Sequence, residues 1–531
     1  MTILTSIARS VVSLSLVGVL LCSLPAQLRA SDEPANKAEE EIEDHTDFDE
    51  LLVPFKTGDD VTRACLECHD ETDEQLRKTQ HWQWHVEDDQ SMGKGGLVAN
   101  NFCISSNKLG DEKCISCHIG WNGKQGEVNC LVCHSLKKMD WREAFEDISA
   151  FVAEGDTEAL AMAADIRAEL QASITAVGHP TAQQCGSCHF YSGGGDGVKR
   201  GDLDSSLVDP PRELDVHLSK AGAGLACRDC HNTSDHQVPG RQYGTSASQY
   251  REQHSGPDSK SFLQCEACHT ATPHQDAQLN KHFDVIACQT CHIPYIGRGN
   301  PTKVWWDWSK AGKLKDGKPY YTKDEHGKKN YMTIKGEFRW EKNIVPHYAW
   351  YNGTMKNLTL ETPLDREKLV DVQVPNGAPG EPNAKIHPFK VHLGRQPYDS
   401  KLNRLLAPML SGDKGYWTTL DWSTSLKAGM EAVGLPFSGE YDFIESRFMY
   451  PVHHTIAPKE QALKCDDCHQ QGGGATTGRL SGVPGIDLTK KERALQQAQE
   501  QAKNERVKRS WLVLVIVVLL IGLALFQVKK R

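Results

Sequence analysis

Two short motifs of the same form bracket one stretch of this chain: NCLVCH at Asn129 to His134 and CGSCH at Cys185 to His189. The second motif runs on into FYSGGGDGVKRGD, which ends at Asp202. Each motif has two cysteines three positions apart and a histidine directly after the second cysteine. The glycine-rich segment carries Lys199, ten residues beyond His189.

The CxxCH motif occurs eight times in the chain. Two cysteines at this spacing can each form a thioether with a haem vinyl group, while the adjoining histidine binds the iron. Paired CxxC units are also typical of zinc sites, but zinc does not require a histidine after every pair. The sequence therefore predicts eight covalently attached c-type haems. Their cysteines and histidines are Cys65, Cys68 and His69; Cys114, Cys117 and His118; Cys130, Cys133 and His134; Cys185, Cys188 and His189; Cys227, Cys230 and His231; Cys265, Cys268 and His269; Cys288, Cys291 and His292; and Cys465, Cys468 and His469.

The motifs use eight of the twenty-three histidines, which leaves fifteen. A haem that only passes electrons is expected to have both axial positions of its iron filled, because ligand exchange at each turnover is then avoided. The remaining histidines could supply these second ligands, although a single surplus histidine can equally be an ordinary hydrogen-bonded residue. The candidates are His81, His217, His236, His254, His274, His282, His392 and His454.

One cysteine and one lysine stand apart from the motifs. Of eighteen cysteines, sixteen belong to motifs and Cys22 lies in the N-terminal apolar run, so Cys103 is left over. It could be an inert buried thiol or a reactive one, and the residues alone leave both interpretations open. Lys199 lies among glycines that let backbone approach a haem or ligand closely. A lysine amine binds iron only when it is deprotonated, and on chemistry alone a surface lysine is the more common case.

Charge and length limit the function classes. The chain has 531 residues and a net charge of -10, which argues against general nucleic-acid binding.

Residues 61–485 hold all eight motifs and are expected to form one octahaem catalytic domain. Within it, residues 141–176 are rich in Ala, Glu and Leu and predict one or two helices, broken near Gly155. Gly, Pro and Asn interrupt residues 293–464 often, which predicts short helices and loops. The expected fold is therefore mainly α with many loops and little β.

The two ends of the chain have the composition of export and anchoring segments. Residues 1–30 have the pattern of a cleaved signal peptide, with a retained anchor as the alternative. Residues 31–60 predict an acidic, disordered spacer, and residues 486–509 a charged helical stalk. Residues 510–528 are uncharged and long enough to cross a bilayer, and residues 529–531 would then be a cytoplasmic tail. The predicted location is the cytoplasmic membrane, with the catalytic domain in the periplasm.

Several segments, in order along the chain, resemble the octahaem tetrathionate reductase family of c-type cytochromes. The resemblance extends from about Val61 to Gln471 and includes all eight motifs. The segments that carry it are NNFCISSNKLGDEKCISCHIGW at Asn100 to Trp121, CGSCHFYSGGGDGVKRGDLDSSL at Cys185 to Leu207, DVHL at Asp215 to Leu218, CRDCHNTSDHQVPGR at Cys227 to Arg241, ACQTCHIP at Ala287 to Pro294, WWDWSKAG at Trp305 to Gly312, GRQPYDS at Gly394 to Ser400 and APKEQALKCDDCH at Ala457 to His469.

The resemblance implies a mostly helical periplasmic protein with one catalytic haem whose iron is bound by a lysine. By position in the matching segments, that lysine is Lys199, and the cysteine beside the active haem is Cys103. The active haem would then be the one attached at Cys114 and Cys117, with bis-histidine haems elsewhere. Asp196, in the same loop as Lys199, is a further candidate for the pocket. Two departures from the family are the segment at 141–176 and the apolar C-terminal segment.

These features predict a reductase of anaerobic respiration that acts on tetrathionate, nitrite or hydroxylamine. Its electrons would come from the quinone pool or a membrane cytochrome. A non-enzymatic electron conduit is one alternative, although a conduit needs no lysine ligand beside a free thiol. A hydroxylamine oxidoreductase-like enzyme is another alternative, with a similar haem count and membrane tail.

Overall fold

The structure is a computed structural model of the whole chain. It describes residues 42–83, 97–99, 102, 119–122, 125–231, 233, 235–238, 240, 264–270, 272–469 and 478–486. The chain divides into two units, Met1–Glu43 and Asp44–Arg531, and all the elements described below belong to the second unit.

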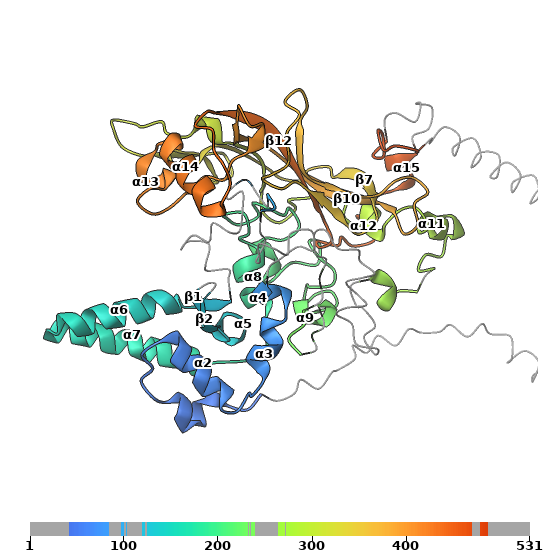
Figure 1. Ribbon diagram of the computed structural model, residues 1–531. Helices are drawn as coiled ribbons and strands as arrows, with labels where there is room; N and C mark the ends of the chain where they lie inside the picture. The colour runs from blue at the N-terminus through green and yellow to red at the C-terminus, as the bar shows by residue number, and fades with distance from the viewer. Residues whose placement is uncertain are drawn as a thin grey trace, which may run out of the picture. The chain divides into compact units, whose positions relative to one another are not determined.

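A mixed sheet of ten strands dominates the part of the chain between the seventh and eighth motifs (Figure 1). Its main path has the order β4-β5-β6-β3-β10-β12-β9-β8, and β7 and β11 also pair with β10. The strands are β3 (Thr302–Asp307), β4 (Tyr321–Lys323), β5 (Lys329–Met332), β6 (Gly336–Glu341), β7 (His347–Tyr351), β8 (Met355–Asn357), β9 (Val370–Pro375), β10 (Lys385–Asp399), β11 (Arg404–Leu405) and β12 (Tyr441–Pro451). A separate antiparallel pair joins β1 (Gly120–Asn122) to β2 (Gln125–Val128).

The long strand β10 is the central element of the large sheet. It pairs antiparallel with β12 from Phe389 opposite Pro451 to Asp399 opposite Tyr441. On its other side it pairs in parallel with β3, where Gly394 lies opposite Trp306. Because neighbours hydrogen-bond to both of its edges, β10 is held rigidly over much of its length.

The sheet is stabilised by an aromatic core. Trp306, Trp308, Phe448 and Tyr450 are each at most 1% exposed and belong to one hydrophobic cluster. Burying a large apolar side chain contributes about 1.5–3 kcal/mol, so these residues account for much of the stability of the region. Helix α14 (Trp422–Val433) adds its buried face to the same cluster, and α13 (Tyr416–Thr419) precedes it.

This sheet shows that the expected fold class was wrong. The chain was predicted to be mainly α with little β, and residues 293–464 to form short helices and loops. About 20% of the structure is strand and about 30% helix. The aromatic and β-branched residues of segments such as TKVWWD at Thr302–Asp307 and HYAWY at His347–Tyr351 favour strands. The glycines and prolines that suggested loops lie between these strands or at tolerated positions within them.

The two longest described helices form a hairpin. Helix α6 (Trp141–Glu154) ends at Gly155, whose φ of 77° is easily adopted only by glycine, and α7 (Thr157–Thr175) packs against it (Figure 1). One or two helices were expected between residues 141 and 176, and two are present. The remaining helices are α2 (Gly58–Leu66), α3 (Thr72–Arg77), α4 (Gln80–Gln83), α5 (Leu131–His134), α8 (Ala182–His189), α9 (Cys227–Cys230), α11 (Ala277–His282), α12 (Cys288–His292) and α15 (Cys465–Cys468).

Part of the segment expected to be a disordered spacer is packed. Short 3-10 turns cover His45–Asp47 and Asp49–Leu51, and Leu51 and Phe55 are buried in a hydrophobic cluster with residues of α6 and α7. The acidic residues of this segment are largely exposed, while its few apolar residues face the core. The acidic composition of this segment therefore predicted disorder, although its few apolar residues are packed.

The structure does not support the predicted membrane anchor. No helix in the part of the chain that the structure describes is long and apolar enough to cross a membrane. The span predicted at residues 510–528 lies outside the described residues, as do the signal peptide at 1–30, the stalk from residue 487 and the tail at 529–531. The predicted localisation in the cytoplasmic membrane is accordingly not retained.

Replacing Gly394 with alanine should destabilise the fold. A Cβ atom at this position would lie 2.4 Å from the carbonyl oxygen of Trp306 and 2.7 Å from the ring of Phe102. Because overpacking of this kind costs about 1–3 kcal/mol, we expect a lower apparent Tm in a thermal scan followed by circular dichroism. Gly240→Ala is the matched control, since a Cβ there meets no described atom within 4 Å. Equal Tm values for the two variants would contradict the close packing at Gly394.

Candidate functional site

Histidines of seven CxxCH motifs each lie opposite a second histidine ring. In every pair the ring centroids are between 6.1 and 6.4 Å apart. The pairs are His69 with His45, His134 with His236, His189 with His81, His231 with His454, His269 with His217, His292 with His274, and His469 with His282.

This separation fits an iron atom between the two rings. A metal–nitrogen bond of about 2 Å on each side, and about 1 Å from nitrogen to ring centre, places the two centroids about 6 Å apart. Direct contact between rings would bring them closer. In the described part of the chain no group of three or more His, Cys, Asp or Glu side chains is arranged to hold a lone metal ion. The motif residues therefore fit haem, with two imidazoles for each iron.

The ring planes fall into two groups. Four pairs are close to parallel, with interplanar angles of 11°, 24°, 18° and 20°, and these are the pairs that contain His45, His454, His274 and His282. The other three, which contain His81, His236 and His217, have angles of 87°, 74° and 59°.

Six of the eight candidate partner histidines lie in these pairs. They are His81, His217, His236, His274, His282 and His454. His45 was missed, because it lies in an acidic stretch that was expected to be unstructured. The apolar residues Phe48, Leu51 and Phe55 follow it at roughly helical spacing, and this pattern could have indicated a packed segment.

The other two candidate partner histidines, His254 and His392, are in none of these pairs. His254 lies outside the described residues, and so do Cys103 and the second motif with Cys114, Cys117 and His118. His392 is buried on β10, and its ring packs against Phe102 at a centroid distance of 4.6 Å, not against a described motif histidine.

Contacts between cysteines show which attachment sites are neighbours. The side chains of Cys65 and Cys130 lie next to each other, as do those of Cys185 and Cys227 and those of Cys265 and Cys288. Three further pairs lie within electrostatic range of each other: Cys133 with Cys185, Cys230 with Cys268, and Cys291 with Cys468. Numbered along the chain, the seven described motifs therefore form one line in the order 1-3-4-5-6-7-8.

Lys199 lies on a tight loop that begins where α8 ends. Gly193 and Gly197 have positive φ angles of 84° and 66°, which turn the chain back so that the backbone N–H of Lys199 donates to the carbonyl of Ser192 at 3.2 Å. The Lys199 ammonium lies 5.5 Å from the centre of the Tyr450 ring. Burial, and then the charge of Arg200, lowers the pKa of Lys199 to about 8. A larger fraction of this amine is therefore neutral than at a surface lysine.

The sheet holds this loop through a buried lysine. Lys390 on β10 is 0% exposed, and its Nζ donates to the carbonyl oxygens of Val198 at 2.6 Å and Lys199 at 3.2 Å. Burial lowers the pKa of Lys390 well below its usual value. These two bonds fix the backbone of Lys199 relative to β10.

The chain next to Cys103 packs against the same face of β10. Phe102 belongs to the hydrophobic cluster that contains Val198, and its carbonyl accepts a hydrogen bond from Trp308 Nε1 at 2.5 Å. His392, two residues after Lys390 and therefore on the same face of the strand, contacts the Phe102 ring. The residues that directly precede Cys103 and Lys199 are thus in one cluster.

Asp196 has a structural role in this loop. Its carboxylate accepts hydrogen bonds from the backbone N–H and hydroxyl of Ser205, at 2.8 and 2.9 Å, and from Asn300 Nδ2 at 3.2 Å. It also lies 3.6 Å from the ammonium of Lys328. These contacts close the loop between Asp196 and Ser205.

Asp202 joins the end of the loop to a paired histidine. Its fully buried carboxylate accepts from the ring Nδ1 of His454 at 3.1 Å and from the backbone N–H of His453 at 2.7 Å. Burial would raise the pKa of Asp202, but the Arg200 charge and these hydrogen bonds hold it well below its usual range.

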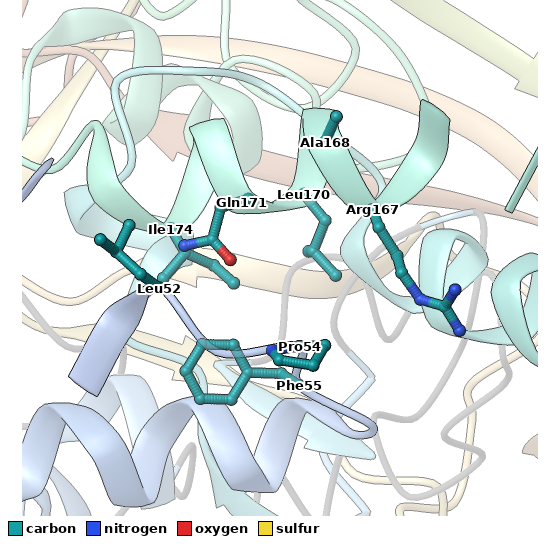
Figure 2. Close-up of a pocket in the computed structure, with 8 residues that line it drawn as sticks. All are labelled: Leu52, Pro54, Phe55, Arg167, Ala168, Leu170, Gln171 and Ile174. Carbon is teal, nitrogen blue, oxygen red and sulfur yellow. The ribbon is translucent and has the colours of Figure 1, made fainter. Parts of the chain in front are cut away.

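A small cavity of about 260 Å³ lies elsewhere, between residues 52–55 and helix α7 (Figure 2). Its lining is mainly apolar, with Leu52, Phe55 and Ile174 among the side chains, and Arg167 lies at one end. None of the residues predicted for catalysis lines it. This cavity is therefore separate from the lysine loop.

Comparison with known proteins agrees with the geometry of the motifs. A family model described as bacterial cytochrome c matches residues 303–472. The crystal structure of octahaem cytochrome c from Shewanella oneidensis superposes with a TM-score of 0.68 and 35% sequence identity, covering 84% of this chain and 98% of that one. An uncharacterised protein of Archaeoglobus fulgidus is 24% identical over 278 residues, which is 41% of this chain and 88% of that protein.

The identity, the coverage and the superposition with the Shewanella protein are high enough to show common ancestry over most of the chain. They also support c-type haem as the cofactor of the CxxCH motifs and a redox role for the protein. The chain belongs to the family of multihaem c-type cytochromes that includes the octahaem cytochrome c of Shewanella oneidensis.

Proposed function

We propose that this protein carries eight c-type haems and reduces a small sulfur or nitrogen compound, such as tetrathionate, nitrite or hydroxylamine. The proposed active haem would be attached through Cys114 and Cys117, and His118 and Lys199 would bind its iron, with the substrate displacing Lys199 or sitting beside it. The observation that carries the proposal is the histidine pairing, because all seven motif histidines that the structure describes have an imidazole opposite them. The second motif lies outside the described residues, and Lys199 is proposed as the second ligand there.

Three features of the lysine loop support this assignment. The loop backbone is fixed to β10 by Lys390, the pKa of the Lys199 amine is lowered, and the chain beside Cys103 packs in the same cluster. A protein that only conducts electrons would not require a lysine on a loop that is hydrogen-bonded to the sheet in this way. Asp196 is proposed to position this loop through Ser205 and Asn300.

The other seven motifs would hold haems with two histidines each, and their line of attachment sites gives the order 1-3-4-5-6-7-8. Haem supplies one-electron redox chemistry, while the protein sets the ligands, the burial and the access of substrate. Filled axial positions favour electron transfer over ligand binding at these sites. The electron donor is proposed to be the quinone pool or a membrane cytochrome.

His45→Ala should create one iron with an open axial position. His45 faces His69 with a nearly parallel ring, so its loss should remove one of the four rhombic low-spin ferric signals expected from near-parallel imidazoles and add a high-spin signal. Electron paramagnetic resonance of the oxidised holoprotein measures both changes. His326→Ala is the control, because His326 lies beside Glu325 and is in none of the seven pairs. An unchanged spectrum in His45→Ala would exclude the pairing with His69.

Lys199→Ala should alter one haem and the catalytic activity together. We expect turnover of tetrathionate, nitrite or hydroxylamine with a reduced dye to fall by at least about tenfold, as happens when groups that support a metal site are removed. The optical spectrum should change at one of the haems at the same time. Lys220→Ala is the control, because the Lys220 side chain is 87% exposed and pairs with Asp209.

Two results would contradict the proposal. One is a wild-type protein that turns over none of the three compounds and has only bis-histidine irons, which would indicate an electron conduit. The other is a Lys199→Ala variant with the spectrum and rates of the wild type.

A further inference from the structure

The buried carboxylate of Asp202 fixes the orientation of the His454 ring. Its Oδ2 lies 3.1 Å from His454 Nδ1 and also accepts the backbone N–H groups of His453 and His454, at 2.7 and 3.1 Å. Because a carboxylate can only accept, His454 Nδ1 carries the proton. The other ring nitrogen, Nε2, is then left as the unprotonated one, which is the form that binds a metal.

Other paired histidines have different partners at the ring. His134 Nδ1 lies 3.1 Å from the backbone oxygen of Gly178, and His236 Nδ1 lies 3.0 Å from the side-chain oxygen of Gln75. Both partners are neutral. Nδ1 of His469 is buried and has no hydrogen-bond partner among the described residues. The contact at His454 therefore differs from these three in bringing a negative charge to the ring.

A buried negative charge at this position has a defined electronic effect. An imidazole that donates its N–H to a carboxylate becomes a stronger electron donor to a metal at its other nitrogen. A stronger donor and a nearby negative charge both stabilise the more positive ferric state over the ferrous state. Arg200, whose Nε lies 3.4 Å from the other carboxylate oxygen, reduces this effect without removing the hydrogen bond.

We infer that Asp202 is a positioning residue that lowers the reduction potential of the haem attached through Cys227 and Cys230. The inference rests on the proposed function, in which His231 and His454 are the two axial ligands of that iron. Asp202 would then set the reduction potential of one haem in the line. The site in question is the fifth motif, in the middle of the line of attachment sites, and it shares a short backbone segment with Lys199.

The test is a potentiometric titration of the full-length holoprotein and its Asp202→Asn variant, followed by visible and electron paramagnetic resonance spectra. The side-chain oxygen of asparagine can still accept a hydrogen bond from His454 Nδ1, but asparagine carries no charge. We expect the ferric-to-ferrous equilibrium of one haem with a near-parallel low-spin signal to shift about tenfold towards ferrous, which is a rise of about 59 mV. The midpoints of the other haems should stay within error of the wild type.

Two further variants separate charge from packing. Asp202→Glu keeps the charge and should retain a midpoint near that of the wild type. A rise in Asp202→Glu equal to that in Asp202→Asn would leave only a packing role and overturn the inference. Asp204→Asn removes a buried carboxylate of the same loop that accepts from Ser206 and Asn300, and it should shift no midpoint.

A fourth variant, His454→Met, keeps the inference and the proposed function distinguishable. If the low-spin signal of the His231–His454 pair persists, so that all four near-parallel signals remain unchanged in His454→Met, the assignment of His454 as a ligand fails, and the inference fails with it. If that signal is lost but Asp202→Asn leaves every midpoint unchanged, the ligation stands and the role of Asp202 is refuted. Turnover of tetrathionate, nitrite or hydroxylamine enters neither result.

Discussion

Two imidazoles that bind one iron must be held about 6 Å apart along a common axis, and this distance allows little movement of either ring. In this chain the two members of a pair often come from distant parts of the sequence. His231 faces His454, and His282 faces His469, with all ten strands of the large sheet lying between them in the sequence. The backbone on both sides must therefore be rigid, and the rest of the structure can be understood from this requirement.

Strand β10 supplies much of that rigidity. Near its start, the carbonyl of Ile386 accepts a hydrogen bond from Thr290 in the seventh motif at 2.8 Å. Further along, Lys390 holds the loop of Lys199, and Gly394 allows Phe102 to approach the strand closely. Its partner β12 ends at Pro451 and leads directly to His454. One strand pair thus sets the positions of the lysine loop, the seventh motif and a paired histidine.

The haem attachment sites could be predicted from the sequence because the chemistry is local. Two thiols and an imidazole within five residues are sufficient, and no knowledge of the fold is needed. The second histidine of each pair is brought into place by tertiary structure, so the sequence could only supply candidates for it. His45 was missed because exposed acidic neighbours masked a few apolar residues that pack, and His392 was chosen although its ring contacts Phe102.

The sheet was missed for a different reason. Strand β10 contains Pro388, Gly394 and Pro397, which normally argue against a central strand. At Gly394 the missing side chain is used for close packing against Trp306 and Phe102. Pro388 has a buried carbonyl that still accepts the N–H of Val452. Interactions between distant segments therefore outweighed the local preferences on which the fold class had been based.

The position of His454 beyond β12 also has a consequence for the order of folding. His45 and His69 are both near the start of the chain and can come together before the sheet exists. His231 is synthesised early too, but its partner has no fixed position until β10 and β12 have paired. The entropic cost of closing a loop rises only slowly with loop length, so the long separation of His231 and His454 costs little stability. The separation affects when the pair can form. The histidine pair at the middle of the line therefore depends on the pairing of β10 with β12, whereas the pair of His45 and His69 does not.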